Sequence, residues 1–306
     1  MKVLYLPVRF IFKFEKSVYA DTYPSFVLRS ILGMNLKQIC CISRKSECQT
    51  CMYNKSCSYA TIFETIEVSS NEILPGRNRI SHPYTITDNS KFDVRNRKID
   101  KFEFTITLYG KTIQYLPYIY AAFVRGGYNG MFKTREKYVV EDVLVNGKSI
   151  LLDENTIQND VLPFSFSYEN QSNINENKEI LVELKTPLRF KVNGKYKDDF
   201  LANDFFACLY RRFKTMMLMY GTEIPDEFPK QSETNLKIED RNLKWIDYSH
   251  YSARQKTAME LGGLIGTLKL VGNISDFELI LLDFAKVANA GKNTNFGLGQ
   301  IDYWIK

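Results

Sequence analysis

Long apolar runs are missing from this sequence of 306 residues. A helix that spans a membrane needs about 18 or more consecutive apolar residues, whereas the most apolar stretch, residues 115–124, carries tyrosine and proline. The opening residues also lack the apolar block of a secretory signal peptide, because Arg9 and Lys13 interrupt them. We therefore expect a cytoplasmic protein with no membrane partner and with reduced thiols.

Glycine, proline and histidine are also scarce, with 16, 9 and 2 residues. So few glycines and prolines exclude a low-complexity or collagen-like chain, and the 44% hydrophobic and 25% charged content is that of a folded globular protein. No Asp-x-Asp or His-Glu-x-x-His pattern provides a catalytic metal site. Aromatic residues, in contrast, make up 14% of the chain, which is enough for a core and for rings that stack on bases.

The net charge of +6 is unevenly distributed. Residues 1–60 hold nine Lys and Arg and three acidic residues, a difference of six, so the other 246 residues sum to zero. A basic segment favours a phosphate-rich partner, although a solvated basic face has the same composition. Two acidic stretches, residues 153–179 and 223–240, read as solvated loops. The cations of the basic segment that could contact phosphates are Arg29, Lys37, Arg44 and Lys45.

The hydrophobic periodicity predicts the order strand, helix, strand, strand, helix, strand, and then the same order again. Two βαββαβ units predict an α+β chain with tandem ferredoxin-like, RRM-like domains. We place them at residues 1–148 and 179–306, joined by an acidic linker at 149–178, with a cysteine-rich insertion at 40–60 after the first helix. The predicted strands are 9–15, 82–88, 102–109, 138–145, 182–185, 243–252, 267–271 and 301–305, and the predicted helices are 28–39, 116–123 (ending at Gly126-Gly127), 205–217 (with Arg211, Arg212 and Lys214 on its outer face) and 277–284.

Five of the six cysteines lie between Cys40 and Cys57. Four thiolates at the spacing C-x6-C-x2-C-x5-C suit a tetrahedral structural zinc, and an iron–sulfur cluster on the same four is the alternative. Unconnected thiols fit less well, because free cysteines prefer burial and this stretch is polar. Cys208 lies on the buried face of a predicted helix and is assigned to the core. The predicted ligands are Cys41, Cys48, Cys51 and Cys57, with Cys40 as a substitute for Cys41.

A glycine-rich loop, residues 290–299, joins the last helix to the last strand. Glycines allow backbone N–H groups to approach a phosphate closely, and Lys292 adds a positive charge. On spacing alone, helix ends and tight turns explain such glycines better. The candidate phosphate-binding residues of this loop are Gly291, Lys292, Gly297 and Gly299.

This ending resembles the glycine-rich carboxy-terminal signature of RAMP-superfamily CRISPR-associated proteins. More specifically, the chain is similar to the endoribonucleases that process precursor CRISPR RNA, the Cas-six type. The family loop reads Gly-x-Gly, five residues, Gly-x-Gly, and here Asn289 replaces the first glycine; asparagine tolerates left-handed backbone better than most residues. Further matching segments are His250–Gly266 (Tyr-Ser-x-Arg-Gln…Gly-Gly-x-x-Gly), Thr186-Pro187-Leu188-Arg189, Arg211-Arg212 and Cys57–Glu64.

The resemblance implies metal-independent RNA cleavage, in which a 2′-hydroxyl attacks the adjacent phosphate and leaves a 2′,3′-cyclic phosphate and a 5′-hydroxyl. Such chemistry needs a base, an acid and cations, and histidine suits the first two roles. His250 lies beside Tyr251, Arg254 and Lys256, which together can bind and activate a phosphate, although a hydrogen-bonded strand histidine is the other interpretation.

The second histidine, His82, could reach the same site from the first domain, although the neighbouring Pro83 favours a structural role at the start of a strand. Two other functions stay open. One is a non-catalytic RAMP subunit that binds and retains guide RNA among the subunits of a CRISPR effector complex. The other is an adaptor whose metal knuckle makes protein contacts.

Overall fold

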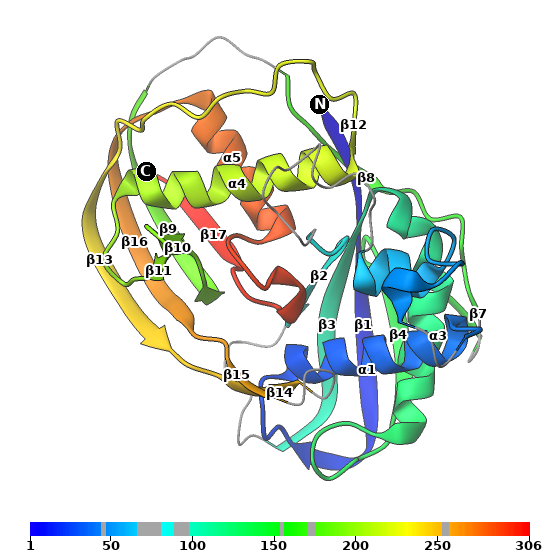
Figure 1. Ribbon diagram of the computed structural model, residues 1–306. Coiled ribbons are helices and arrows are strands. Elements are labelled where there is room, and N and C mark those ends of the chain that lie inside the picture. Colours follow the sequence, from blue (N-terminus) through cyan, green and yellow to red (C-terminus); the bar gives the residue numbers. More distant parts are fainter. Residues whose placement is uncertain (44–46, 66–80, 89–97, 154–155, 170–175, 253–256) are drawn as a thin grey trace. The chain divides into compact units, whose positions relative to one another are not determined.

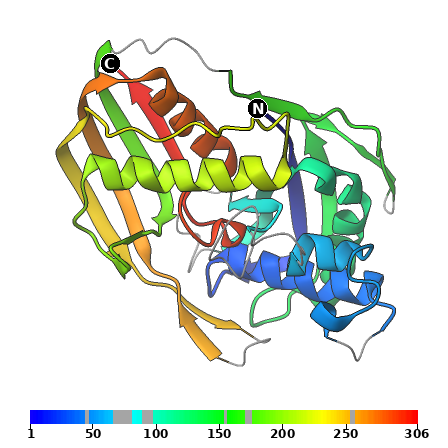
Figure 2. The ribbon, with the colours of Figure 1, turned by 45° about the horizontal axis from the view of Figure 1, so that its top comes forward.

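The computed structural model describes residues 1–43, 47–65, 81–88, 98–153, 156–169, 176–252 and 257–306, with only the backbone described for 176, 249–252 and 257–259. The chain divides into two compact units, coloured along the sequence in Figures 1 and 2. The N-terminal unit contains residues 3–166 and 218–221, and the C-terminal unit contains residues 1–2, 167–217 and 222–306. The division after residue 166 falls inside the stretch predicted as an acidic linker.

The N-terminal unit is built on an antiparallel sheet with the strand order β2-β3-β1-β4-β5. Helices α1 and α3 contact each other and cover one face of this sheet (Figure 1). The elements are β1 (Lys2–Tyr19), α1 (Pro24–Cys40), η1 (Cys48–Thr50), η2 (Ala60–Glu64), β2 (Tyr84–Asp88), β3 (Lys98–Tyr109), η3 (Gly110–Tyr115), α3 (Leu116–Asn129), β4 (Tyr138–Val145), β5 (Lys148–Ser149), β6 (Leu151–Asp153), β7 (Thr156–Ile157) and β8 (Phe164–Ser167).

The core of the N-terminal unit follows from the alternation along β1. Phe10 and Phe12 are fully buried, as the period of two predicts. Phe10 stacks on Phe104 of β3 with ring centroids 5.4 Å apart, and Phe12 stacks on Tyr138 of β4 at 4.1 Å. Both rings also contact Phe123 of α3, so aromatic packing joins the helix layer to the sheet.

The helix α3 does not end at Gly126-Gly127, as the sequence predicted, but continues to Asn129. A Cβ atom on Gly126 would lie 2.3 Å from Cγ2 of Ile31 in α1, and one on Gly127 would lie 2.1 Å from the carbonyl oxygen of Tyr138. The glycine pair therefore serves close packing rather than helix termination. The helix ends at Gly130, where φ is +75°.

The C-terminal unit repeats the same arrangement, with the antiparallel strand order β13-β16-β9-β17 and with α4 and α5 on one face of the sheet (Figures 1 and 2). Ser275 and Glu278 form a capping box that begins α5. The elements are β9 (Glu176–Leu188), β10 (Lys191–Val192), β11 (Lys195–Tyr196), α4 (Ala202–Tyr220), β13 (Lys237–Ile246), β14 (Ser249–Ser252), β15 (Thr257–Glu260), β16 (Gly263–Ile274), α5 (Asp276–Ala288), η4 (Thr294–Phe296) and β17 (Ile301–Ile305). After α4, the short strand β12 (Gly221–Thr222) pairs with β1 in the sheet of the N-terminal unit.

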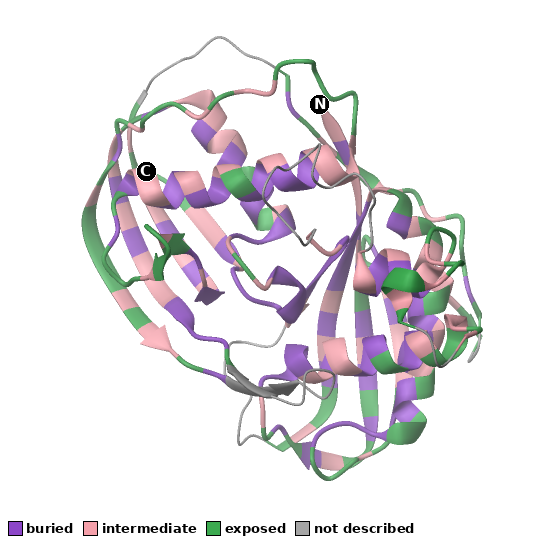
Figure 3. Cartoon of the chain, in the orientation of Figure 1, coloured by how far each residue is buried: buried purple, intermediate pink, exposed green. Residues whose placement is uncertain are grey.

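Two details of the C-terminal unit differ from the sequence prediction. The strand expected over residues 243–252 is two strands, because β13 ends at Ile246 and β14 then pairs with β15 in a separate hairpin. The sequence predicted three cations on the outer face of α4. Arg212 is not one of them, because it is buried with 5% exposure, whereas Arg211 is exposed. In Figure 3, α4 consists mostly of buried and half-buried residues. No helix in the described part of the chain is both long and apolar enough to cross a membrane.

Candidate RNA-processing site

Helix α1 places two cations and a glycine on one face. Arg29, Gly33 and Lys37 are spaced at i, i+4 and i+8, which aligns them along the helix. The ring of Phe63, from η2, lies directly against Gly33, where a Cβ atom would be 2.3 Å from Cζ of the ring. Glycine is therefore required at this position for the ring to pack against the helix.

These contacts bring three predicted site residues around two stacked rings. The guanidinium carbon of Arg29 is 4.5 Å from the ring centroid of Phe63, and Tyr59 stacks on Phe63 at 5.6 Å. The Nζ atom of Lys37 is 5.7 Å from the centroid of Tyr59. The imidazole of His82 lies 6.0 Å from the centroid of Phe63. We call Arg29, Lys37, Tyr59, Phe63 and His82 the aromatic–cation cluster.

The cluster combines a titratable imidazole with two cations. His82 precedes β2 and is half-buried, with its ring 5.6 Å from that of the fully buried Tyr84. Arg29 and Lys37 are also half-buried. A phosphate near these groups meets a proton donor or acceptor together with positive charge, which is the combination that phosphodiester cleavage requires. Sequence reasoning named the three charged or titratable residues but missed Tyr59 and Phe63 as their support; Gly33 between the two cations was the available signal.

In the C-terminal unit, the glycine-rich loop is held by its own backbone. The N–H of Lys292 donates to the carbonyl oxygen of Arg189 at 2.8 Å, and the N–H of Gly299 donates to the carbonyl oxygen of Pro187 at 3.1 Å. The N–H of Ala290 donates to the carbonyl oxygen of Gly299 at 2.7 Å. These three N–H groups are therefore occupied by the fold, and the tight-turn interpretation explains them. The exposed side chain of Lys292 is the cation that the loop presents.

Two polar side chains, those of Asn289 and Arg212, brace this loop, and that of Arg189 binds backbone outside it. Asn289 has φ +56° and donates its side-chain amide to the carbonyl oxygen of Leu298 at 3.1 Å. Its φ is positive, as at a position where the family has glycine, but its ψ of 165° lies outside the left-handed helical region that asparagine tolerates. Arg212 donates from Nε and Nη2 to the carbonyl oxygen of Ala288 at 3.1 and 2.9 Å, and Arg189 donates to that of Gly262 at 2.7 Å. Both arginines thus bind the backbone.

Two family models match the chain. The AF_1859_N family model, described as an N-terminal domain, matches residues 3–162, more than half of the chain, so the chain belongs to that family. The model of the CRISPR-associated endoribonuclease Cas6 matches residues 182–301. Residues 182–301 therefore form a domain of the CRISPR-associated endoribonuclease Cas6 family. This confirms the resemblance in the sequence and the prediction of an endoribonuclease that processes precursor CRISPR RNA, and it does not favour a non-catalytic RAMP subunit.

Solved Cas6 structures share the fold. Cas6 (TTHB231) of Thermus thermophilus has 14% identity and a TM-score of 0.54, with 99% of each chain covered. The product complex of Cas6 (TTHA0078) has 12% identity and a TM-score of 0.51, covering 99% of this chain and 100% of that one. This likeness confirms tandem ferredoxin-like domains. No curated protein matches the chain.

The other predicted site residues of this chain are not brought together by the described contacts. His250 and Tyr251 lie on β14, opposite Met259 and Ala258 of β15, and only their backbone is described. The predicted residues Arg254, Lys256, Arg44 and Lys45 lie outside the described residues. Their assigned roles therefore stay predictions.

The predicted cysteine ligands share one pocket. Cys40, Cys41, Cys48, Cys51 and Cys57 all line a pocket of about 270 Å³, and none forms a disulfide. Burial, with the nearby Cys57, raises the pKa of Cys40 to about 11, and burial, with the nearby Glu64, raises the pKa of Cys48. Within the described ranges, no three His, Cys, Asp or Glu side chains form a group that could hold a metal ion. The zinc assignment stays a prediction.

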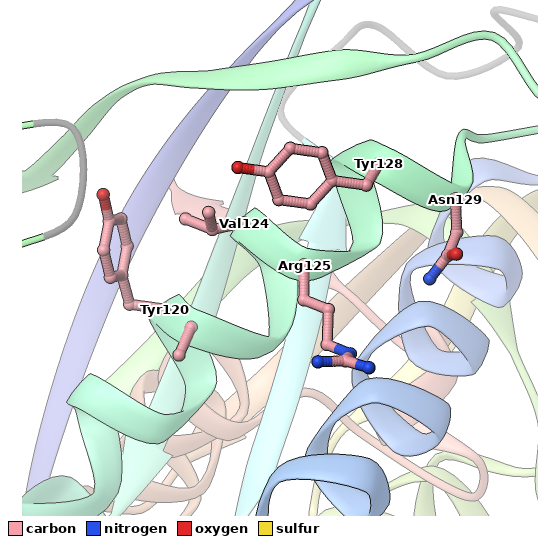
Figure 4. Close-up of a pocket in the computed structure, with 6 residues that line it drawn as sticks. Tyr120, Val124, Arg125, Tyr128 and Asn129 are labelled. Carbon is pink, nitrogen blue, oxygen red and sulfur yellow. The ribbon is translucent and has the colours of Figure 1, made fainter.

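A further hollow, of about 460 Å³, lies on α3 (Figure 4). It is lined by Tyr120, Val124, Arg125 and Tyr128 with two smaller neighbours, and the side chain of Tyr128 is exposed. The Nε atom of Arg125 donates to Oε1 of Gln38 in α1 at 2.9 Å. An exposed ring beside a guanidinium can stack on a nucleobase. Sequence reasoning did not single out these residues, because their helical spacing was assigned only to the core.

Proposed function

We propose that this protein cleaves precursor CRISPR RNA without a catalytic metal, with His82 as the proton-transfer group. The observation that carries the proposal is the aromatic–cation cluster, in which the imidazole of His82 and the guanidinium of Arg29 contact the same ring, Phe63. The sequence favoured a structural role for His82 because of the adjacent Pro83. The cations gathered beside the imidazole support the catalytic role.

In the proposed reaction, the 2′-hydroxyl oxygen attacks the adjacent phosphorus and the bond from phosphorus to the 5′-oxygen breaks. His82 accepts the 2′-hydroxyl proton when neutral or donates a proton to the 5′-oxygen when charged. Each such transfer is worth roughly 10²–10⁴ in rate. Arg29 and Lys37 stabilise the negative charge that develops on the phosphorane, and Arg29 can do so with two parallel hydrogen bonds.

The C-terminal unit contributes RNA contacts in this proposal. Lys292 presents an exposed cation on the glycine-rich loop, and the β14–β15 hairpin carries His250 and Tyr251. Arg254 and Lys256 follow in the sequence between the two strands of that hairpin and add positive charge. His250, with Tyr251 and Arg254, is the alternative catalytic set, and the experiment below separates it from His82.

The partners we propose are RNA and other CRISPR subunits, in the cytoplasm. Two of the similar structures are described as Cas6 product complexes, and a third as a partial Cas6-RT-Cas1--Cas2 complex, in which this chain spans 46% of the matched chain. The excess positive charge of residues 1–60 favours the RNA partner.

The test is a cleavage assay on labelled repeat RNA in EDTA, with the same RNA carrying a 2′-deoxy nucleotide at the scissile position as substrate control. We expect wild-type cleavage with a 2′,3′-cyclic phosphate end and no cleavage of the deoxy substrate. His82→Ala should lower the single-turnover rate by roughly 10²–10⁴ with nearly unchanged RNA affinity. Lys133→Ala, whose side chain is 88% exposed in the same unit, is the matched control for the preparation.

Three outcomes contradict the proposal. Cleavage that stops in EDTA and returns with added Mg²⁺ would contradict metal independence. Full activity in His82→Ala, with activity lost in His250→Ala or Arg254→Ala, would assign the chemistry to the hairpin. RNA that binds tightly and is never cut would restore the interpretation as a guide-RNA-retaining subunit.

A further inference from the structure

Five thiols converge on one place in the N-terminal unit. Cys40 ends α1, Cys48 and Cys51 flank a single turn at η1, and Cys57 precedes η2, yet all of them line the same pocket as Cys41. Random placement of cysteines on a polar loop does not direct each of them to one pocket. The pocket is formed almost wholly by residues of this same segment, so the segment folds around a space that its thiols line.

The segment that carries these thiols has no core of its own. Between residues 41 and 58, none of the described residues is buried, and the apolar side chains of Ile42 and Met52 are 83% and 84% exposed. Every cysteine of the segment, in contrast, is only partly exposed. A short segment without buried apolar residues needs a cross-link to hold one conformation, and no disulfide supplies it.

The local backbone already has the turns that bring the thiols together. The N–H of Cys41 donates to the carbonyl oxygen of Lys37 at 2.9 Å and so caps α1. The N–H of Cys51 donates to the carbonyl oxygen of Cys48 at 3.4 Å, which closes the C-x2-C turn. The N–H of Thr61 donates to the carbonyl oxygen of Cys57 at 2.9 Å. Three of the turns are thus fixed at a cysteine.

We propose that Cys41, Cys48, Cys51 and Cys57 bind one structural zinc ion. Four soft thiolates favour zinc in tetrahedral geometry with Zn–S bonds of about 2.3 Å. The described side chains do not already form a finished ligand group, so metal binding draws the sulfur atoms inward across the pocket, with loss of the thiol protons. The segment that would move has no buried residue among those described, so the movement breaks no core packing.

Zinc at this position connects the end of α1 to η2. Lys37 is four residues before Cys41, and Tyr59 is two residues after Cys57, so both lie next to proposed ligands. The ion would hold the helix that carries Arg29 and the turn that carries Phe63 in their observed contact. The metal is thus structural, and the inference does not depend on the proposed cleavage reaction.

The test measures metal on the full-length protein purified without chelator or metal-affinity tag. We expect about one zinc per chain, as for a single four-thiolate site, and Co²⁺ replacing it with the charge-transfer absorption of cobalt–thiolate bonds. Cys48→Ser and Cys51→Ser should lose most of the zinc and the cobalt absorption. Cys208→Ala, which removes the buried thiol in the C-terminal unit, is the matched control and should retain both.

A comparison of Cys40→Ser with Cys41→Ser decides the fourth ligand, because only the true ligand should lower zinc content and cobalt absorption. Circular dichroism of each variant separates metal loss from global unfolding. Folded wild-type protein that binds neither zinc nor cobalt would overturn the proposal. So would equal zinc content in the wild type and Cys48→Ser, or acid-labile sulfide with iron in place of zinc.

Discussion

The two units have the same order of elements and the same strand order but use their arginines differently. In the N-terminal unit, Arg29 lies over the ring of Phe63 and is half-buried. In the C-terminal unit, Arg189 lies over the ring of Tyr196 and also donates to a backbone carbonyl oxygen, whereas Arg212 is buried and donates to backbone. The fold is repeated, and among the described arginines only Arg212, in the C-terminal unit, is buried.

One glycine at each of the two sites, Gly33 and Gly299, also differs in what it contacts. Gly33 lets an aromatic side chain approach the backbone of α1, whereas Gly299 lets one stretch of backbone approach another, at Ala290. The N-terminal unit thus supports side chains that can meet RNA, and the C-terminal unit stabilises a loop whose exposed cation is Lys292. Substitutions that separate these two uses test the comparison.

The largest effect is expected at Gly299, where φ is +76° and a Cβ atom would lie 1.8 Å from the carbonyl oxygen of Ala290. Gly299→Ala combines left-handed strain with a backbone clash, and we expect the free energy of unfolding to fall by about 2–5 kcal/mol. Gly194→Ala has φ +78° with nothing within 4 Å, so it isolates the strain, at about 1–2 kcal/mol. Urea unfolding measures both, and equal losses would show that loop contact is unimportant.

The next effect concerns Arg212, whose guanidinium donates twice to the carbonyl oxygen of Ala288. Arg212→Met removes both hydrogen-bond donors from the carbonyl oxygen of Ala288. The free energy of unfolding should therefore fall by about 1–3 kcal/mol. Arg211→Met changes the exposed neighbour and should stay within about 0.5 kcal/mol of the wild type. If Arg211→Met were the more damaging in urea unfolding, the bracing role of Arg212 would be wrong.

Hydrophobic periodicity predicted the helices and strands because each element must place its apolar residues on the one face that is buried. The alternation of Phe10 and Phe12 gave β1, and the spacing of Phe205, Leu209 and Phe213 gave α4. Periodicity did not predict that Arg212 is buried, because the reason is a carbonyl oxygen 76 residues away at the end of α5. Periodicity also predicted that the helix ends at Gly126-Gly127. The actual role of these glycines, close packing against Tyr138, depends on tertiary structure that the local pattern does not contain.

The sequence predicted which types of residue form the site, but not how they come together. Charge identified Arg29 and Lys37, and scarcity identified His82, since only two histidines exist. The contact that gathers them is a ring from η2 resting on Gly33, 30 residues earlier, and no local pattern contains it. The sequence identified the glycine-rich loop. It did not predict which N–H groups of the loop form hydrogen bonds within the fold.

A smaller effect should separate the two units in RNA binding. Arg29→Ala and Lys37→Ala should each weaken RNA affinity roughly tenfold, by loss of a charged contact, and lower the magnitude of the salt slope by about 0.7 per single-strand contact. Lys292→Ala makes the same measurement in the C-terminal unit. Lys133→Ala is the control for charge alone, and a salt slope that responds to it as strongly would mean that overall charge, not the cluster, binds RNA.

The smallest effect concerns Asp302 of the C-terminal unit, which binds Lys286 at 2.9 Å and Lys185 at 2.7 Å. Burial opposes ionisation, but hydrogen bonds from both lysines outweigh it and lower the pKa of Asp302 to about 2 from 3.8. Because the folded pKa is the lower one, the stabilisation is present above about pH 4 and disappears as the pH falls towards 2.

Asp302→Asn should therefore lose about 1 kcal/mol at pH 7, after allowance for solvent screening, and lose less further stability than the wild type between pH 4 and pH 2. Urea midpoints at both ends of this range measure the difference. Glu227→Gln disrupts a pair with Lys230 in which the side chains are 80% and 85% exposed, so it should leave the acid dependence unchanged. An identical acid loss in the wild type and Asp302→Asn would show that the two lysines do not stabilise the last strand through this carboxylate.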